Sequence, residues 1–480
     1  MAIQSTGIGS GLDANSIITQ LMAIENRPLT RLQQTASTTQ TQLSSYGALK
    51  SRIAALGEAA EKLAAAASWT KTKPTSSDST ALSVTSTDSA APVNLQIEVS
   101  QLARAQSVAT TALPSSTSVV GTGTLMIQFG SWSENFAAFT PTVPVSSASI
   151  TIGAGENTLA GIRDKINASG VGVTAAILND SNGARLVLRS TATGAESGFR
   201  ITATDDDATP LDDSGLSRLA FNPPAGAPAS GNQRAVDLVA SVNGAPVTSA
   251  SNKLDNLIEG VSVQVVKTTT GPVSVAVARD TDSMKTLIQQ FVTAYNDANK
   301  FLADQTRYNA DSKTSATLQG DRIAVGLQGQ LRALVATQSS ASSVFGTLSS
   351  AGMALQRDGS LKIDDIKLTA ALTNLPELAK LFGSDGGGNP LAVGIARRFD
   401  VLADSSSGTG GSLESREEGL KQSLTRNRTD QERFSDRMTM VEARLRAQYT
   451  ALDLKMAQLN GLSTYMTQQV AQFNKGGYGR

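Results

Sequence analysis

The feature that most constrains this chain is a column of apolar side chains at seven-residue intervals near its C-terminal end. Only Gln431 interrupts the column, whose other members are Leu424, Met438, Leu445, Leu452, Leu459 and Met466. A second set falls four residues before members of this column and consists of Leu420, Phe434, Val441 and Leu462. Steps of three and four residues keep both sets on one face of an α-helix. The pattern therefore predicts a long helix that packs against another helix through a narrow apolar stripe.

The same spacing recurs near the other end of the chain, within residues 44–67. Its members are Tyr46, Leu49, Ile53, Leu56, Ala60 and Leu63. We expect the two ends of the chain to meet each other, or to meet copies of themselves, and the stripes to stay uncovered in a single chain. The predicted interface for oligomer or filament contacts consists of Leu49, Ile53, Leu56, Leu63, Leu424, Met438, Val441, Leu445, Leu452 and Leu459. An internal helical hairpin without an intermolecular role is the alternative that the pattern leaves open.

The composition changes abruptly between the two helical ends. Residues 70–280 are rich in Ser, Thr, Gly, Ala and Val, and short segments alternate between apolar and polar side chains. This alternation predicts short antiparallel strands joined by turns. One helix is expected inside the block at 158–167, with Asn157 or Thr158 as its N-cap and Gly170 as its end.

This layout predicts an α+β multidomain protein, in which both termini form a coiled-coil helical stem and a strand-rich, two-part head is inserted between them. A flexible Ser/Gly hinge is expected at 405–412, before the last helix. The expected division has four parts. They are a terminal coiled-coil segment that is flexible before assembly (1–40 with 430–480), a helical leg (41–72 with 278–429), an inner β-rich head domain (73–120 with 233–277) and an outer head domain (121–232).

The composition also excludes several kinds of chemistry. The chain has no histidine and no cysteine, so it cannot use imidazole bases, cysteine nucleophiles, thiolate zinc sites or disulfides. Lys+Arg and Asp+Glu both number 41, so no net charge attracts nucleic acid or anionic lipid. No segment approaches the roughly 18 consecutive apolar residues of a membrane span, and the N-terminus lacks the pattern of a cleavable secretion signal. Since no catalytic constellation is visible, we expect no enzyme activity, cofactor or metal.

Several short motifs, taken in order, resemble the flagellar filament cap protein family, also called hook-associated protein 2. The opening Gly7-Ile8-Gly9-Ser10-Gly11-Leu12-Asp13 is similar to the start of that family, and Lys165-Ile166-Asn167 with the strands that follow resembles the flagellin hook IN motif, here within the outer head domain. Further landmarks are Asn252-Lys253-Leu254, Leu318-Gln319-Gly320-Asp321, Asp358-Gly359-Ser360-Leu361 and the C-terminal helix at 449–470. The resemblance covers nearly the whole chain.

The resemblance implies a structural protein at the distal tip of the bacterial flagellum, secreted through the flagellar type III export route. Members of that family form homo-oligomeric rings, often pentamers, that promote flagellin polymerisation and prevent loss of exported flagellin. The implied partners are copies of the chain itself, flagellin, hook-filament junction proteins and an export chaperone, without nucleic acid binding or membrane insertion. Two other interpretations stay open: another flagellar axial protein, such as a junction protein or a flagellin, and a surface adhesin with a helical tether.

Overall fold

The computed structural model of the chain describes residues 13–207, 214–223 and 231–476. They form two compact units, of which the first combines the described residues up to Trp69 with those from Thr281 onward, and the second runs from Thr70 to Asp280. Residues 7–12 of the N-terminal motif lie outside the described residues. The first unit is mainly helical and the second is built from antiparallel sheets, which confirms the predicted α+β class.

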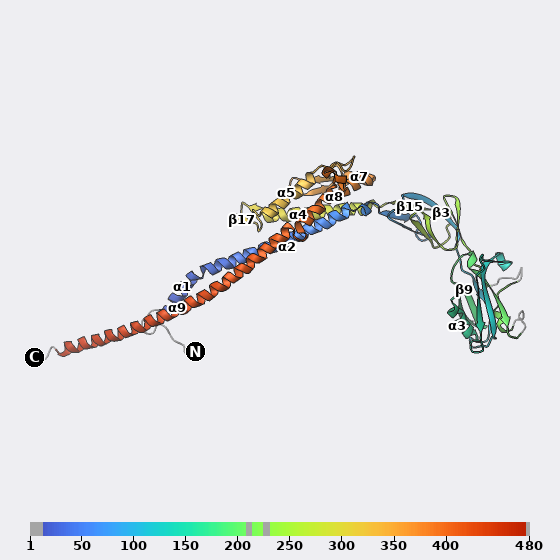
Figure 1. The fold of residues 1–480 in the computed structure, drawn as a ribbon, viewed down its shortest axis with the longest axis horizontal. Coiled ribbons are helices and arrows are strands. Elements are labelled where there is room, and N and C mark those ends of the chain that lie inside the picture. The colour runs from blue at the N-terminus through green and yellow to red at the C-terminus, as the bar shows by residue number, and fades with distance from the viewer. Residues whose placement is uncertain (1–12, 208–213, 224–230, 477–480) are drawn as a thin grey trace. The chain divides into compact units, whose positions relative to one another are not determined.

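The helices of the first unit pack side by side, and in Figure 1 the N-terminal helices α1 and α2 run along α9. The helices are α1 (Ala14–Glu25), α2 (Arg27–Ala64), α4 (Thr281–Thr306), α5 (Arg322–Ala336), α6 (Asp365–Ala371), α7 (Leu375–Gly383), α8 (Ile395–Ser407) and α9 (Ser412–Gly476). Two short hairpins complete the unit and consist of β16 (Tyr308–Asn309) with β17 (Thr314–Ser315), and β18 (Met353–Leu355) with β19 (Leu361–Ile363).

One apolar core holds the helical unit together. The stripe of α2 is completely enclosed in it, since its six members are at most 1% exposed: Tyr46, Leu49, Ile53, Leu56, Ala60 and Leu63. They pack against α4, α8 and the start of α9, which contribute Phe291, Phe399 and Leu413 among others. Burial of one such Leu or Ile side chain stabilises a fold by roughly 1.5–3 kcal/mol, so this stripe is a major source of stability for the unit.

The hinge that we expected at 405–412 is shorter than predicted. Helix α8 continues to Ser407, and α9 begins at Ser412. The hydroxyls of Ser405 and Ser407 donate to the backbone carbonyls of Leu402 and Ala403, at 3.0 and 2.8 Å. Because serine can bond back to the preceding turn in this way, a serine-rich segment need not end a helix.

The second unit contains two large apolar cores and a small third cluster formed by Ala90, Val261 and Val277. The first core lies between a five-stranded sheet of order β1-β15-β3-β11-β12 and a three-stranded sheet of order β13-β14-β2. Its strands are β1 (Thr72–Ser76), β2 (Leu82–Ser86), β3 (Val93–Gln101), β11 (Leu238–Val242), β12 (Ala245–Ser249), β13 (Lys253–Ile258), β14 (Val261–Val265) and β15 (Val273–Arg279). Leu95, Ile97 and Val99 alternate along β3 and all point into this core, as the period of two predicts.

The second core is enclosed by two further sheets and one helix. One sheet has the order β4-β9-β8, and in the other β5 pairs with β10, β6 and β7. The elements are β4 (Ser107–Ala109), β5 (Gly123–Trp132), β6 (Phe139–Pro141), β7 (Ser147–Ile152), α3 (Leu159–Ser169), β8 (Val173–Asp180), β9 (Gly183–Ser190) and β10 (Gly198–Asp205). Because Val108 and Leu113 belong to this second core, the two cores separate before residue 107, earlier in the chain than the expected boundary at 120.

Helix α3 has the ends that the sequence predicts. The Thr158 side chain accepts a hydrogen bond from the backbone N–H of Gly161, and Gly170 ends the helix at a φ of 61°, where glycine is favoured. Near the end of the helix, Asn167 Oδ1 accepts from Ala175 N at 2.7 Å and its Nδ2 donates to Ala175 O at 2.9 Å. Since β8 is an edge strand, this side chain takes the place of a neighbouring strand at Ala175.

Candidate assembly surface

The two ends of the chain form an antiparallel helix pair within the first unit. At one end of the pair, Lys50 Nζ lies 3.5 Å from Glu414 Oε1. At the other end, Arg446 Nη1 donates to Asn15 Oδ1 at 3.4 Å. The part of α9 between Glu414 and Arg446 is therefore matched against the chain from residue 50 back to residue 15, first along α2 and then along α1.

The predicted stripe of α9 lies against α2 and α1 as far as Leu445. Met438 is 5% exposed, while Leu424, Val441 and Leu445 are half-buried. The polar interruption at Gln431 is satisfied inside the helix, because its Nε2 donates to Asn427 Oδ1 at 2.6 Å. A polar pair on an apolar stripe lowers stability but favours one register of the two helices.

The remaining predicted interface residues fall into two contrasting groups. Leu49, Ile53, Leu56 and Leu63 lie in the core of the helical unit, so the N-terminal stripe is already covered within one chain and does not stay uncovered as we expected. The physical reason is that α8 and α4 pack on α2 in addition to α9. In the second group, Leu452 is 43% and Leu459 is 58% exposed.

We call residues 447–476 of α9 the tail. At a rise of 1.5 Å per residue the tail extends roughly 45 Å beyond Arg446, and Figure 1 shows α9 continuing past the start of α1. Every tail residue from 457 to 472 is exposed. The large apolar side chains that stay exposed on the tail are Leu452, Leu454, Leu459, Leu462, Tyr465, Met466 and Val470. Neighbouring exposed apolar side chains are typical of interaction sites.

A polar cluster holds the first turns of α9 against the helical unit. The Tyr46 hydroxyl donates to Asp321 Oδ1, and Arg416 Nη2 lies 3.2 Å from Asp321 Oδ2. Asp321 also caps α5 by accepting from the backbone N–H groups of Ile323 and Ala324. Burial, followed by the hydrogen bond and charge of Asp321, raises the pKa of the Tyr46 phenol above its usual range. The cluster joins α2, α5 and α9 at one point.

Asp321 stays ionised in this cluster. Burial alone would raise the pKa of its carboxyl, but the hydrogen bonds from Tyr46 and the two backbone N–H groups, together with the Arg416 charge, hold the pKa below its usual value of 3.8. No local sequence pattern predicts this cluster, because its residues lie 275 and 95 positions apart. Only the start of α5 could be foreseen locally, since Asp is a favoured N-cap.

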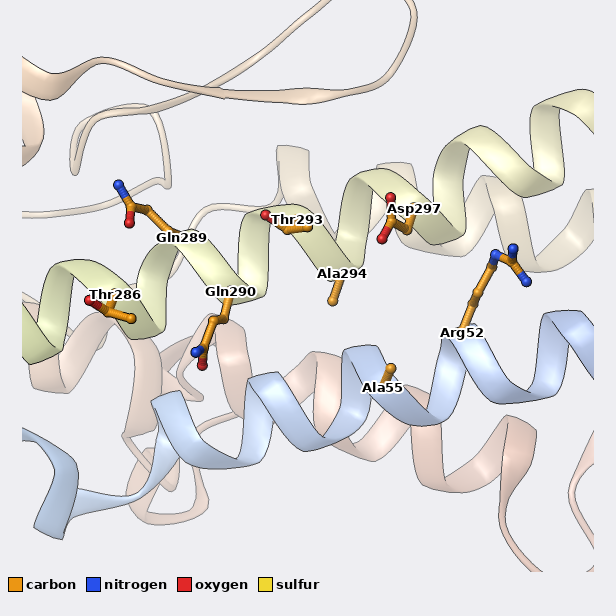
Figure 2. A pocket seen from close by; sticks show the side chains of 8 residues that line it. All are labelled: Arg52, Ala55, Thr286, Gln289, Gln290, Thr293, Ala294 and Asp297. Atoms are coloured by element: carbon orange, nitrogen blue, oxygen red, sulfur yellow. The ribbon is translucent and has the colours of Figure 1, made fainter.

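A groove of about 340 Å³ lies between α2 and α4. Figure 2 shows Ala55 and Ala294 pointing towards each other between the two helices, and these short side chains leave the space open. At one end Arg52 lies over the Phe301 ring, 4.3 Å from its centroid, and donates to Ala48 O at 3.0 Å. The other residues that line the groove are Thr286, Gln289, Gln290, Thr293 and Asp297.

Two further properties concern the part of the chain that the structure describes. Within residues 13–207, 214–223 and 231–476, no three His, Cys, Asp or Glu side chains gather in a way that could hold a metal ion. In the same residues, no helix combines the length and apolar character that crossing a membrane requires.

Comparisons with known proteins agree along most of the chain. The family described as flagellar hook-associated protein 2 N-terminus matches residues 10–106, and the corresponding C-terminus family matches residues 235–461. Flagellar hook-associated protein 2 of Escherichia coli K12 is 31% identical over 486 residues, with 98% of each chain covered. The B-type flagellar hook-associated protein 2 of Pseudomonas aeruginosa PAO1 is 29% identical over 493 residues, with 99% of each chain covered.

A solved structure shows the same arrangement of elements. The D1-D2-D3 domains of the flagellar cap protein FliD from Escherichia coli are similar with a TM-score of 0.55 and 27% identity, covering 78% of this chain and 99% of that chain. Terminal helices with a strand-rich insertion, matched over this length, define an axial protein of the bacterial flagellum. The chain belongs to the flagellar hook-associated protein 2 family, as its motifs led us to expect.

Proposed function

We propose that this protein caps the distal tip of the bacterial flagellar filament, where it promotes flagellin polymerisation and prevents loss of exported flagellin. The observation that supports this role most directly is the match to cap proteins over nearly the entire chain, from the helical unit through the sheet unit. The role is structural and extracellular, and it requires no catalysis, cofactor or metal. Neither a surface adhesin nor another flagellar axial protein accounts for this match.

The assembly that we propose is a homo-oligomeric ring, often a pentamer in this family, which contacts flagellin and the hook-filament junction proteins. An export chaperone would accompany the chain before secretion through the type III route. We assign the terminal segment (1–40 with 430–480) and the leg (41–72 with 278–429) to attachment. The inner and outer head domains, which correspond to the two large cores of the sheet unit, then form the plate of the cap.

Within the attachment region, we propose that intermolecular contacts are made by the uncovered part of the predicted stripe. Leu452 and Leu459 are exposed, so they can be buried by a partner without any rearrangement of the chain. Leu49, Ile53, Leu56 and Leu63 support that surface from inside, because they hold α2 in place against α9. Leu424, Met438, Val441 and Leu445 keep α9 on the paired helices.

The test is deletion of the gene in the source bacterium, followed by complementation. Deletion should leave cells without filaments and with flagellin in the medium, and the wild-type gene should restore filaments. A double variant, Leu452→Ser with Leu459→Ser, should restore them poorly, whereas the exposed polar control Gln448→Ser should complement fully. If the deletion strain grows normal filaments and loses only surface attachment, the protein is an adhesin and the proposal is wrong.

A further inference from the structure

A polar pocket lies where the chain passes from one large core of the second unit to the other. On the way out, Ala103 belongs to the first core and Val108 to the second. On the way back, backbone hydrogen bonds join Val236 to Arg104, so the two crossing segments lie side by side. The pocket beside them has a volume of about 470 Å³, and seven of the nine residues that line it are polar. None of these described residues is Asp or Glu.

Two guanidinium groups, those of Arg104 and Arg234, line this pocket without a carboxylate partner. Arg234 Nη1 donates to Trp132 O at 3.0 Å, and Arg104 is exposed. Asp237 is close in sequence, but its Oδ1 accepts from Ala195 N. Among the described residues, no carboxylate lies within 4.0 Å of either guanidinium. Five other cations of the same unit do have such partners, at 2.7–3.6 Å: Arg163, Lys165, Arg185, Lys253 and Lys267. The pocket therefore concentrates positive charge that the described part of the chain does not neutralise.

Two amide side chains in the pocket wall are held by the backbone. Gln101 Nε2 donates to Asp237 O at 2.8 Å, and Gln233 Nε2 donates to Ala105 O at 2.9 Å. No described residue donates to the Oε1 atom of either amide. Both glutamines are thus fixed in place by their nitrogen atoms, while their oxygen atoms keep the capacity to accept hydrogen bonds.

These groups define the chemistry of a ligand. The planar guanidinium fork matches the two oxygens of a carboxylate, and the bond is strong because both groups are charged. Two guanidinium groups in one pocket repel each other, and an anion bound between them removes that repulsion. The amide oxygens need donors, which a hydroxyl group supplies and an ionised carboxylate does not. The volume falls in the range of about 300–1,000 Å³ that is usual for small-molecule sites.

We propose that Arg104 and Arg234 bind the carboxylate of a small hydroxylated acid, while Gln101 and Gln233 accept hydrogen bonds from its hydroxyl groups. Sugar acids and free hydroxycarboxylic acids share this chemistry. Because the ligand contacts both crossing segments, its binding links the two large cores and stabilises the second unit. The inference does not depend on the proposed function, since the pocket uses no residue of the segments assigned to attachment.

Isothermal titration calorimetry of the full-length chain tests the site with two pairs of probes at millimolar concentrations. Glucuronate represents the sugar acids, and glucose is its neutral counterpart. Citrate represents the free hydroxycarboxylic acids, and tricarballylate is the counterpart that lacks the hydroxyl group. We expect glucuronate, citrate or both to bind several-fold more tightly than the counterpart, and the one that binds identifies the source of the ligand. If neither binds, or if each binds no more tightly than its counterpart, the proposal is overturned.

Arginine variants show whether the probe occupies this pocket. Arg104→Gln should weaken binding by at least about tenfold, because a hydrogen bond to a charged group is lost. Arg234→Lys keeps the charge but loses the planar fork, and it should also bind more weakly. Arg189→Gln is the matched control, since Arg189 is exposed on β9 of the same unit, and it should bind as the wild type does. Circular dichroism checks that each variant is folded. If folded Arg104→Gln and Arg234→Lys both bind like the wild type, the probe lies elsewhere and the proposal is wrong.

Discussion

Gly57 provides a quantitative test of how closely α2 and α8 are packed. It is a buried residue in the C-terminal third of α2, and a Cβ atom at this position would lie 2.7 Å from the Cβ of Ala403 on α8. Two carbon atoms pack best at about 3.5–4.0 Å, so an added methyl group would force the helices roughly 1 Å apart. Gly47, in the same helix, has room: its nearest neighbour would be Glu417 Oε1 at 3.6 Å.

The two glycines should therefore respond in opposite directions to alanine. In a helix interior, alanine is favoured over glycine by about 1 kcal/mol, which is the gain expected for Gly47→Ala. At Gly57 the same gain is opposed by an overpacking cost of about 1–3 kcal/mol. We expect Gly57→Ala to lower the free energy of unfolding by about 0–2 kcal/mol, so that the two variants differ by about 1–3 kcal/mol.

Urea unfolding followed by circular dichroism at the helical band measures this difference. Adding Ala403→Gly to Gly57→Ala removes the opposing methyl group and should recover most of the lost stability relative to Ala403→Gly alone. If Gly57→Ala raises the unfolding midpoint as much as Gly47→Ala does, the two helices are not in close contact at this point and the reasoning fails.

Two further predictions concern polar contacts. Tyr46→Phe removes a donor to Asp321 and should lower the free energy of unfolding at pH 7 by about 1.5–3 kcal/mol. Because the folded-state pKa of Asp321 lies below 3.8, its ionised form contributes stability above that pH. The difference in unfolding free energy between the wild type and Tyr46→Phe should therefore disappear as the pH falls through the folded-state pKa. A difference that persists in acid would contradict this explanation. Asn167→Ala leaves two backbone groups of Ala175 without their partner and should destabilise the second unit by about 1–3 kcal/mol, with faster hydrogen exchange at Ala175, whereas the exposed control Asn179→Ala should change neither.

Periodicity and helix-end chemistry made the local structure predictable. The spacing of Leu49, Ile53 and Leu56 was enough to place a helix and its buried face, and Thr158 with Gly170 fixed the ends of α3. The alternation of apolar and polar residues along β3 predicted both the strand and its core-facing side. These signals depend only on residues that are close together in the sequence. They can therefore be recognised without knowledge of the tertiary structure.

The neighbours of each apolar face could not be predicted in the same way. A stripe shows that a face is buried but not what buries it, and we assigned the α2 stripe to a surface when α8 and α4 cover it. Asp321 and Arg416 carry no local sign of their contact, because only the tertiary fold brings α5 and α9 together.

The long separation of the paired ends has a consequence for the order of folding. Asn15 and Arg446 are 431 positions apart, and Leu413 completes the core around α2. Whether the chain emerges from a ribosome or from a narrow export channel, α1 and α2 emerge first. They cannot complete their contacts until nearly all of the remaining polypeptide has followed. The sheet unit has no such delay, since both of its large cores use residues 70–280 alone. Folding of this protein should thus begin in its middle and finish at its ends.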